Sequence, residues 1–196
     1  MLKDLRPAIV SMVLFTLFFG LAYPLAMTGA IGAIFPAQAG GSLIKDASGQ
    51  VIGSSLIAQG FARPEYLHPR PSAAGNGYDP LSSGGTNMGP LDKKLIDRVK
   101  GDAATIAKQD NAQSIPADAV TTSASGLDPD ISPANATLQA ARVASSRGAL
   151  VADVQAIINA HTTLPFLGFV GQPAVNVLAV NRALDQSFPM AHPRVP

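Results

Sequence analysis

The sequence contains no cysteine, which excludes both disulfide bonds and thiolate metal sites. Charged residues are also scarce, at 14% of the chain, whereas an average soluble domain has roughly 25%. The scarcity is greatest near the N-terminus, where no Asp, Glu, Lys or Arg lies between Arg6 and Lys45. One part of the chain therefore suits apolar surroundings, and the rest must be stabilised by a hydrophobic core instead of disulfides.

Signatures of phosphate and metal chemistry are missing as well. A phosphate-binding G-x-x-x-x-G-K-[ST] loop needs a Gly-Lys pair, and the sequence has none. The Asp-Lys-Thr-Gly run of phosphorylated ion pumps is also absent. The three histidines, His68, His161 and His192, are far apart and lack a second ligand at metal spacing. His161 is instead predicted to lie at a helix end, where an imidazole interacts favourably with the terminal carbonyls.

Two short patterns resemble catalytic motifs. Ser42 and Lys45 have the S-x-x-K spacing of a Ser/Lys hydrolase, but that chemistry needs a helix and this stretch has a strand pattern. No K-T-G or S-D-N partner motif accompanies it. Asp128 and Asp130 form a possible carboxylate pair, which we expect to accept hydrogen bonds from turn and helix amides. A membrane-anchored Ser/Lys hydrolase remains an alternative function.

A long apolar run begins shortly after the N-terminus. Ala8–Met27 would form a helix of about 30 Å, long enough to cross the hydrocarbon of a bilayer, and Pro24 is expected to kink its last turn. Lys3 and Arg6 lie directly before the run, so the positive-inside rule predicts a cytoplasmic N-terminus and residues 36–196 outside the cytoplasm.

An alternative is that the apolar run is a signal peptide. Ala37-Gln38-Ala39 matches a signal-peptidase site, although the apolar core is about twice the usual length. Cleavage would release a secreted, soluble binding protein. Beyond residue 35 the chain has twelve basic and twelve acidic residues, so no net charge attracts nucleic acid or anionic lipid.

The first half of the domain is predicted to be loop-rich. A hairpin is expected around 45–50, where a polar stretch ending in Gly separates two apolar runs. Apolar residues at helical spacing predict a helix over 90–109, with Pro90 in its first turn and Thr86 or Asn87 as its cap. Residues 114–132 are expected to be irregular.

The second half is predicted to be more regular. Ser132-Pro133 is typical of a helix start and Gly148 of a helix stop, which gives a helix ending at Arg147. A further helix is expected over 150–161, a buried strand over 174–180, and one helical turn over 181–185.

These elements predict a single N-terminal transmembrane helix followed by an extracytoplasmic α+β domain. The expected divisions are a cytoplasmic N-terminus (1–7), a transmembrane helix (8–30), a juxtamembrane linker (31–41), the domain (42–187) and a loose tail (188–196).

Residues 69–90, PRPSAAGNGYDPLSSGGTNMGP, have either the composition of a flexible linker or that of a specified loop. Tyr78-Asp79-Pro80 is typical of a turn start, and Gly84-Gly85 allows backbone angles closed to other residues. These features favour an ordered loop.

Together with QGFARPEYLHPRPS before it, this run resembles the C subunit of the Kdp high-affinity potassium-transporting ATPase. Two further blocks agree, TTSASGLDPDISPANATLQAARVASSRG (121–148) and GQPAVNVLAVNRALD (171–185). With the single N-terminal span, the likeness covers almost the whole chain in order.

The resemblance implies a non-catalytic accessory subunit in the cell inner (plasma) membrane. Its partners would be a channel-like potassium-translocating subunit, a P-type ATPase subunit and a small single-span subunit. The complex uses ATP, Mg and K, and this chain is expected to bind none of them itself. The family's C subunit is described as a catalytic chaperone that raises the ATPase subunit's affinity for ATP and is needed for assembly. ATP is cytoplasmic, so we expect an indirect effect through the channel-like subunit.

Two sets of residues are candidate contacts. The matching blocks contain polar or aromatic residues that either brace the domain's own loops or touch the channel-like subunit: Arg70, Tyr78, Asn87, Asp128, Gln139 and Arg142. Small residues spaced along the apolar run would let another helix approach closely, unless they reflect only the Ala-rich composition: Ala22, Ala26, Gly29, Ala30 and Ala33.

Overall fold

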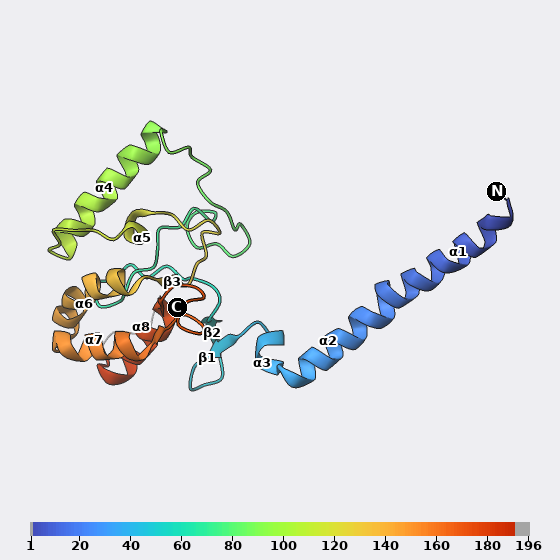
Figure 1. Ribbon diagram of the computed structural model, residues 1–196. Helices are drawn as coiled ribbons and strands as arrows, with labels where there is room; N and C mark the ends of the chain where they lie inside the picture. The colour runs from blue at the N-terminus through green and yellow to red at the C-terminus, as the bar shows by residue number, and fades with distance from the viewer. Residues whose placement is uncertain (1, 191–196) are drawn as a thin grey trace. The chain divides into compact units, whose positions relative to one another are not determined.

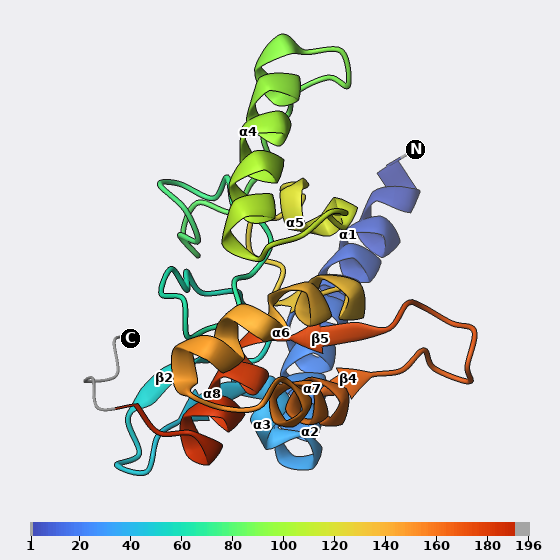
Figure 2. The same cartoon turned by 90° about the vertical axis from the view of Figure 1, so that its left-hand side faces the viewer.

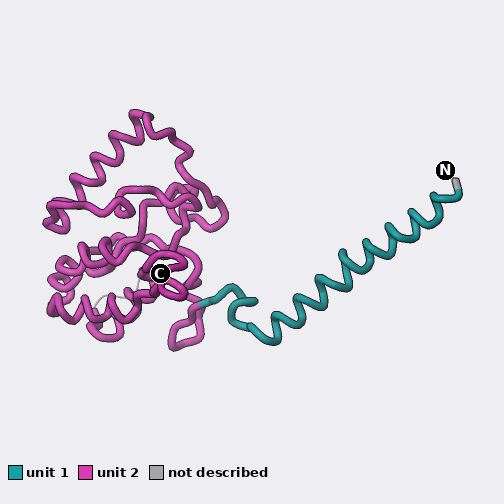
Figure 3. The backbone as a smooth tube through the Cα atoms, viewed as in Figure 1, with its two compact units in different colours: residues 1–43 teal, residues 44–196 magenta. Residues whose placement is uncertain are grey.

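The computed structural model describes residues 2–190 and divides the chain into two units, residues 1–43 and residues 44–196 (Figure 3). The first unit is helical. α1 (Leu2–Leu17), the π-helical turn η1 (Phe18–Ala22) and α2 (Tyr23–Ile34) follow one another without a break (Figure 1), and the short α3 (Pro36–Ala39) comes next.

The helix from Lys3 to Ile34 is long and apolar enough to span a membrane, and none of the residues in its most apolar stretch is buried. The expected transmembrane segment 8–30 lies inside it, and the bounds of the crossing itself stay a prediction. Within the expected linker 31–41, α2 continues to Ile34 and α3 occupies Pro36–Ala39.

The irregularity expected at Pro24 takes the form of the π-helical turn before it. The backbone N–H of Tyr23 donates to the carbonyl of Phe18, five residues earlier. Pro24 has no N–H and cannot continue the ordinary i→i−4 ladder, and a wider turn is one way in which a helix accommodates such a break.

The second unit begins with the predicted hairpin. β1 (Leu43–Lys45) and β2 (Val51–Ser54) form a two-stranded sheet. The turn between them is built around Asp46, whose carboxylate accepts hydrogen bonds from the backbone N–H groups of Ser48 and Gln50 at 2.8 and 3.0 Å.

The next helix starts later than predicted. α4 runs from Lys93 to Gln109, and its cap is Asp92, whose side chain accepts a hydrogen bond from the N–H of Lys94. The expectation of a start at Pro90 with Thr86 or Asn87 as cap was wrong, because the Asp92 carboxylate accepts a hydrogen bond from one of the first free amides, that of Lys94, and so starts the helix at Lys93. No residue of α4 is fully buried. The stretch expected to be irregular, 114–132, contains the short α5 (Ala117–Val120) and β3 (Asp130–Ile131).

The core lies between three helices and a small sheet. α6 (Pro133–Arg147) contacts α7 (Val151–Ala160), which contacts α8 (Val177–Ser187). The antiparallel sheet has the order β3-β5-β4, with β4 at Thr162–Thr163 and β5 at Ala174–Asn176. Most of the largest fully enclosed side chains are aliphatic, namely Leu67, Val143, Val154, Ile158, Val175, Val180 and Leu184, and two are the amides Asn135 and Asn181.

The predicted limits of α6 and α7 are confirmed. The Ser132 hydroxyl accepts a hydrogen bond from the N–H of Asn135, Pro133 occupies the first turn, and Gly148 ends α6 with a left-handed φ of 63°. α7 ends at Ala160 and is capped by His161, whose Nδ1 lies 2.9 Å from the carbonyl of Ile157, as expected for a helix-terminal imidazole.

The prediction of a strand over 174–180 was wrong beyond Asn176. The Asn176 side chain accepts a hydrogen bond from the N–H of Ala179 and thereby starts α8. The apolar run then continues with helical spacing, because Val177, Val180 and Leu184 all face the core. The expected single turn over 181–185 is part of this longer helix. The predicted loose tail, 188–196, is described only as far as residue 190.

Candidate partner-contact site

The loop of residues 69–90 is ordered, and it is held by the loop before β3. The N–H of Ser123 donates to the carbonyl of Pro71 at 3.2 Å, and the N–H of Gly84 donates to the carbonyl of Ser125 at 2.8 Å. The hydroxyl of Ser72 donates to the carbonyl of Gly126 at 2.6 Å. Two of the three blocks that carry the resemblance are therefore in direct contact, and the expectation of a specified loop is confirmed.

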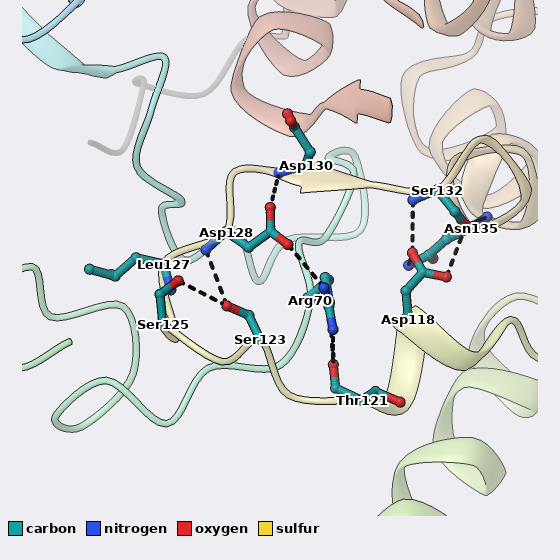
Figure 4. A network of polar contacts seen from close by, with 10 residues as sticks. All are labelled: Arg70, Asp118, Thr121, Ser123, Ser125, Leu127, Asp128, Asp130, Ser132 and Asn135. Carbon is teal, nitrogen blue, oxygen red and sulfur yellow. Dashed lines mark hydrogen bonds and ion pairs between the residues drawn. The ribbon is translucent and has the colours of Figure 1, made fainter. Parts of the chain in front are cut away.

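Arg70 and Asp128 join these two loops through their side chains (Figure 4). Their guanidinium and carboxylate groups form an ion pair at 2.9 Å, and Arg70 also points to the carbonyl of Thr121. The other Asp128 oxygen accepts a hydrogen bond from the N–H of Asp130 at 3.1 Å. Asp128 thus satisfies a turn amide, as predicted, and also pairs with Arg70.

Tyr78 closes the first turn of the loop. Its hydroxyl donates to the carbonyl of Arg70 at 2.9 Å, and its backbone N–H donates to the hydroxyl of Ser72 at 2.9 Å. Burial raises the pKa of the Tyr78 phenol to about 12, so the phenol stays a hydrogen-bond donor at any physiological pH. Asn87 differs from the other candidates because it is exposed, with a left-handed φ of 52°.

Gln139 pairs with a peptide backbone as a neighbouring strand would. Its amide oxygen accepts a hydrogen bond from the N–H of His68 at 2.7 Å, and its amide nitrogen donates to the carbonyl of the same residue at 3.1 Å. Asn181 of α8 does the same for Leu67, at 2.8 and 3.0 Å. Both amides are buried, with 4% and 1% of their surface exposed. Side chains of two helices therefore fix two consecutive residues of an extended segment.

Two arginines of α6 complete this pairing. Arg142 donates to the carbonyls of Pro64 and Tyr66 at 2.6 and 2.9 Å, and Arg147 donates to the carbonyl of Glu65 at 2.7 Å. With the two amides, helix side chains satisfy the carbonyl of every residue from 64 to 68. We call residues 64–68 the clamped segment.

Both arginines are also paired with carboxylates. Arg142 forms an ion pair with Asp110 at 2.7 Å, and their side chains are only 6% and 4% exposed. Arg147 forms one with Asp185 at 2.9 Å, and its guanidinium lies 5.0 Å from the centre of the Tyr66 ring. Gln139 and Arg142 share a helix face, as predicted, and are hydrogen-bonded at 2.7 Å.

A second polar network is hydrogen-bonded to the Gln139 amide. The Asp118 carboxylate accepts hydrogen bonds from the N–H and hydroxyl of Ser132 and from the amide of Asn135 (Figure 4). Asn135 in turn accepts a hydrogen bond from the Gln139 amide at 3.0 Å. This chain of contacts fixes the orientation of the Gln139 amide toward the clamped segment.

A cavity of about 290 Å³ lies beside the clamped segment, lined by polar groups of His68, Tyr78, Asp102, Asp110 and Gln139, among others. Burial, and secondarily the nearby charge of Arg142, lower the pKa of His68 below its ordinary value. Burial likewise raises the pKa of Asp130, against the effect of its hydrogen bond from Asn176. Within residues 2–190, no three His, Asp or Glu side chains gather as a metal site would require.

Comparison with known proteins identifies the family. Residues 5–186 match the family model described as K+-transporting ATPase, c chain (KdpC). The chain belongs to the KdpC family. It is 64% identical over 189 residues to the potassium-transporting ATPase KdpC subunit of Caulobacter sp. (strain K31), covering 96% of each chain. It is 57% identical to the KdpC subunit of Beijerinckia indica over the full length of both.

In this KdpC-family chain, five of the six polar or aromatic candidates bind other parts of the domain, and Asn87 alone of the six is exposed. The residues that sequence analysis missed are Asp118, Asn135, Arg147 and Asn181. Their signal was available: each is a polar residue on, or directly beside, the apolar face of a helix.

The small residues of the apolar helix, Ala22, Ala26, Gly29, Ala30 and Ala33, are exposed. They are open to contact with another helix, and that role stays a prediction. Lys45 ends a strand and not a helical turn after Ser42, so the geometry expected of a Ser/Lys hydrolase is not formed.

Proposed function

We propose that this chain is a membrane-anchored, non-catalytic accessory subunit of a potassium-transporting ATPase complex. The family match over residues 5–186 carries the proposal. One helix of sufficient length and apolarity to anchor the chain supports it. So does the architecture of the domain, whose conspicuous polar residues brace loops through hydrogen bonds and ion pairs.

We further propose that the domain lies outside the cytoplasm and docks over the potassium entrance of the channel-like subunit. Lys3 and Arg6 precede the apolar helix, and the next basic residue is Lys45, which favours a cytoplasmic N-terminus. In that orientation a membrane separates the domain from ATP. An accessory subunit that raises the ATPase subunit's affinity for ATP would then act indirectly, through the channel-like subunit.

Co-purification tests the accessory role. The chain would be isolated in mild detergent from potassium-starved cells through a C-terminal tag, and the co-eluting chains would be identified by mass. We expect a P-type ATPase subunit, a large channel-like subunit and a small single-span subunit in fixed ratio. Isolation of the chain alone, with its N-terminus at Gly40, would contradict the proposal and favour a secreted protein.

Cysteine labelling tests the orientation, because the natural chain has no cysteine to interfere. Ser145 is exposed on α6, and Asp4 is exposed near the N-terminus. A membrane-impermeant maleimide should label Ser145→Cys on cells whose outer membrane alone is permeable, and Asp4→Cys only after the inner membrane is opened. The reverse pattern would place the domain in the cytoplasm and allow direct nucleotide contact.

Asn87 is the candidate contact that the domain itself does not occupy. Asn87→Gly removes the side chain and keeps the left-handed backbone accessible. We expect this variant to keep its thermal stability and to recover less of the channel-like subunit in the same purification. Unchanged recovery would remove Asn87 from the contact surface.

A further inference from the structure

The connection between β4 and β5 presents a group of exposed apolar side chains. Its tip, residues 164–171, has the sequence LPFLGFVG and extends away from the helices of the domain (Figure 2). Leu164, Phe166, Leu167 and Phe169 are 71–77% exposed, and Val170 is 51% exposed. We call residues 164–171 the apolar tip. Apolar side chains gathered in this way on a soluble surface indicate a binding site.

The central part of the apolar tip is hydrogen-bonded within itself, through four of its backbone N–H groups. Phe166 and Val170 exchange N–H to carbonyl hydrogen bonds at 3.0 and 2.9 Å. The N–H groups of Gly168 and Phe169 donate to the carbonyls of Pro165 and Phe166 at 3.0 and 3.3 Å. Each backbone group satisfied in this way lowers the cost of moving the tip from water into an apolar medium.

The side chains of the tip favour lipid over protein as the occupant. None of the eight residues from Leu164 to Gly171 has a side chain that can donate or accept a hydrogen bond. Protein interfaces combine apolar anchors with a polar rim and are enriched in Tyr, Trp and Arg. Insertion into lipid, in contrast, penalises each polar or charged side chain.

The chain also brings its domain to a membrane. Only nine residues, 35–43, separate the end of α2 at Ile34 from the second unit, which begins at Ile44. Nine residues span at most about 30 Å when fully extended. The domain is thus confined near the bilayer that its apolar helix crosses, and an exposed apolar segment is presented to lipid at high effective concentration.

We propose that the apolar tip inserts into the lipid surface on the side where the domain lies, as a second membrane contact of the same chain. The proposal rests on the anchoring helix of the proposed function and holds for either orientation. No Asp, Glu, Lys or Arg lies between Asp153 and Arg182. Insertion should therefore depend on apolar contact and not on anionic lipid or on salt.

The natural chain has no tryptophan, so a single introduced tryptophan reports its own surroundings. The reporters would be Phe169→Trp and Leu164→Trp at the tip, and Leu91→Trp as the control, since Leu91 is 90% exposed and lies in the loop before α4. The full-length chain would be reconstituted in phosphatidylcholine vesicles with and without brominated acyl chains. We expect both tip reporters to emit at shorter wavelength than the Leu91→Trp control and to be quenched by bromine. The Leu91→Trp control should show neither effect.

A tip variant checks that the apolar side chains cause the effect. Phe166→Asp, added to the Leu164→Trp reporter, should shift the emission back to longer wavelength and abolish the quenching. Tip reporters that stay in water, or that become buried only when the other subunits are added, would overturn the proposal and in the latter case identify a protein surface. Quenching of Leu91→Trp to the same extent would overturn it as well. Alkaline extraction of the vesicles tests the anchoring helix separately.

Discussion

The Gln139 side chain carries more of the domain's organisation than its size suggests. It satisfies both backbone groups of His68, accepts a hydrogen bond from Arg142 and donates one to Asn135. Its removal would leave buried polar groups without partners on three sides, and each such group costs about 1–3 kcal/mol.

We therefore predict that Gln139→Ala lowers the free energy of unfolding by about 2–4 kcal/mol, given the cost of unsatisfied buried groups. The measurement is chemical denaturation of the purified full-length chain in detergent. Gln155→Ala is the matched control, since Gln155 bonds only to Asn159 on the surface of α7, and surface changes usually stay within about 0.5 kcal/mol. Equal effects of the two substitutions would contradict a special role for Gln139.

A pH dependence follows from His68. Its pKa is lowered in the folded chain by burial and by Arg142, so between the lowered value and about 6.5 the unfolded chain binds more protons. Stability should therefore fall as the pH decreases below about 6.5 and level off below the folded-state pKa.

The check is to compare the stability of the natural chain with that of His68→Gln. The difference between their unfolding midpoints would be measured at a series of pH values. The difference should shrink as the pH falls through this window. Asp130, whose raised pKa has the opposite sign, contributes only at lower pH, near and above 3.8. A constant difference from pH 5 to pH 8 would show that folding does not lower the pKa of His68.

At this scale the sequence identified the residue types but not their partners. Gln139 and Arg142 were predicted to share a helix face, which follows from their spacing alone. Their bonds to residues 64–68 join positions about seventy residues apart, and no local pattern contains that information. Arg147 and Asn181 were missed because a polar residue on an apolar helix face looks like an interruption until its partner is known.

At the scale of loops and helices, the contact between the 69–90 loop and the loop before β3 depends on Gly126. A Cβ atom added there would lie 2.7 Å from the backbone nitrogen of Ala74 and 2.8 Å from the carbonyl oxygen of Gly84, and the φ of Gly126 is +70°. No side chain fits without moving the backbone of the 69–90 loop.

Gly126→Ala should accordingly destabilise the chain by about 2–3 kcal/mol, because it adds overlap to an unfavourable backbone angle. Gly101→Ala provides the contrast: Gly101 lies inside α4 with open space around it, so alanine should stabilise by about 0.5–1 kcal/mol. Thermal unfolding of the two variants measures both the expected destabilisation by Gly126→Ala and the expected stabilisation by Gly101→Ala. A Gly126→Ala variant as stable as the natural chain would mean that the two loops are not tightly packed.

Helix boundaries were predictable where a cap is local and ambiguous where two caps compete. Ser132, Pro133 and Gly148 defined α6 correctly because each acts on its own turn. Asp92 was overlooked because Pro90 offered an earlier start. For α8, an unbroken apolar run was consistent with strand or helix, and the contact with the core decided for helix.

For the whole molecule, the apolar helix is expected to hold the chain in its complex as well as in the membrane. Ala26 lies among the small residues that would face a neighbouring helix. We predict that Ala26→Leu lowers the recovery of the channel-like subunit in co-purification and leaves membrane insertion intact, because the larger side chain prevents close approach.

Leu25→Ile is the control, since Leu25 lies about 100° around the helix from Ala26 and the change keeps side-chain volume. Both variants should remain in the membrane after alkaline extraction. Full recovery of partner subunits with Ala26→Leu would show that the small residues reflect composition only.

The family was recognisable from the sequence because three unusual blocks occur in order, and two of them turn out to be packed against each other. The exposed apolar tip was not foreseen. Residues 164–171 look like an ordinary apolar stretch, and only the structure shows that the domain leaves them uncovered.

The clamped segment has a consequence for how the chain is made. Leu67 is paired through Asn181, which lies 114 residues later and close to the C-terminus. During synthesis residues 64–68 emerge long before their partners in α6 and α8 exist. Pairing over such a separation is slow, because loop closure must come before any contact rewards it. The domain thus stays unfinished until α8 has left the ribosome.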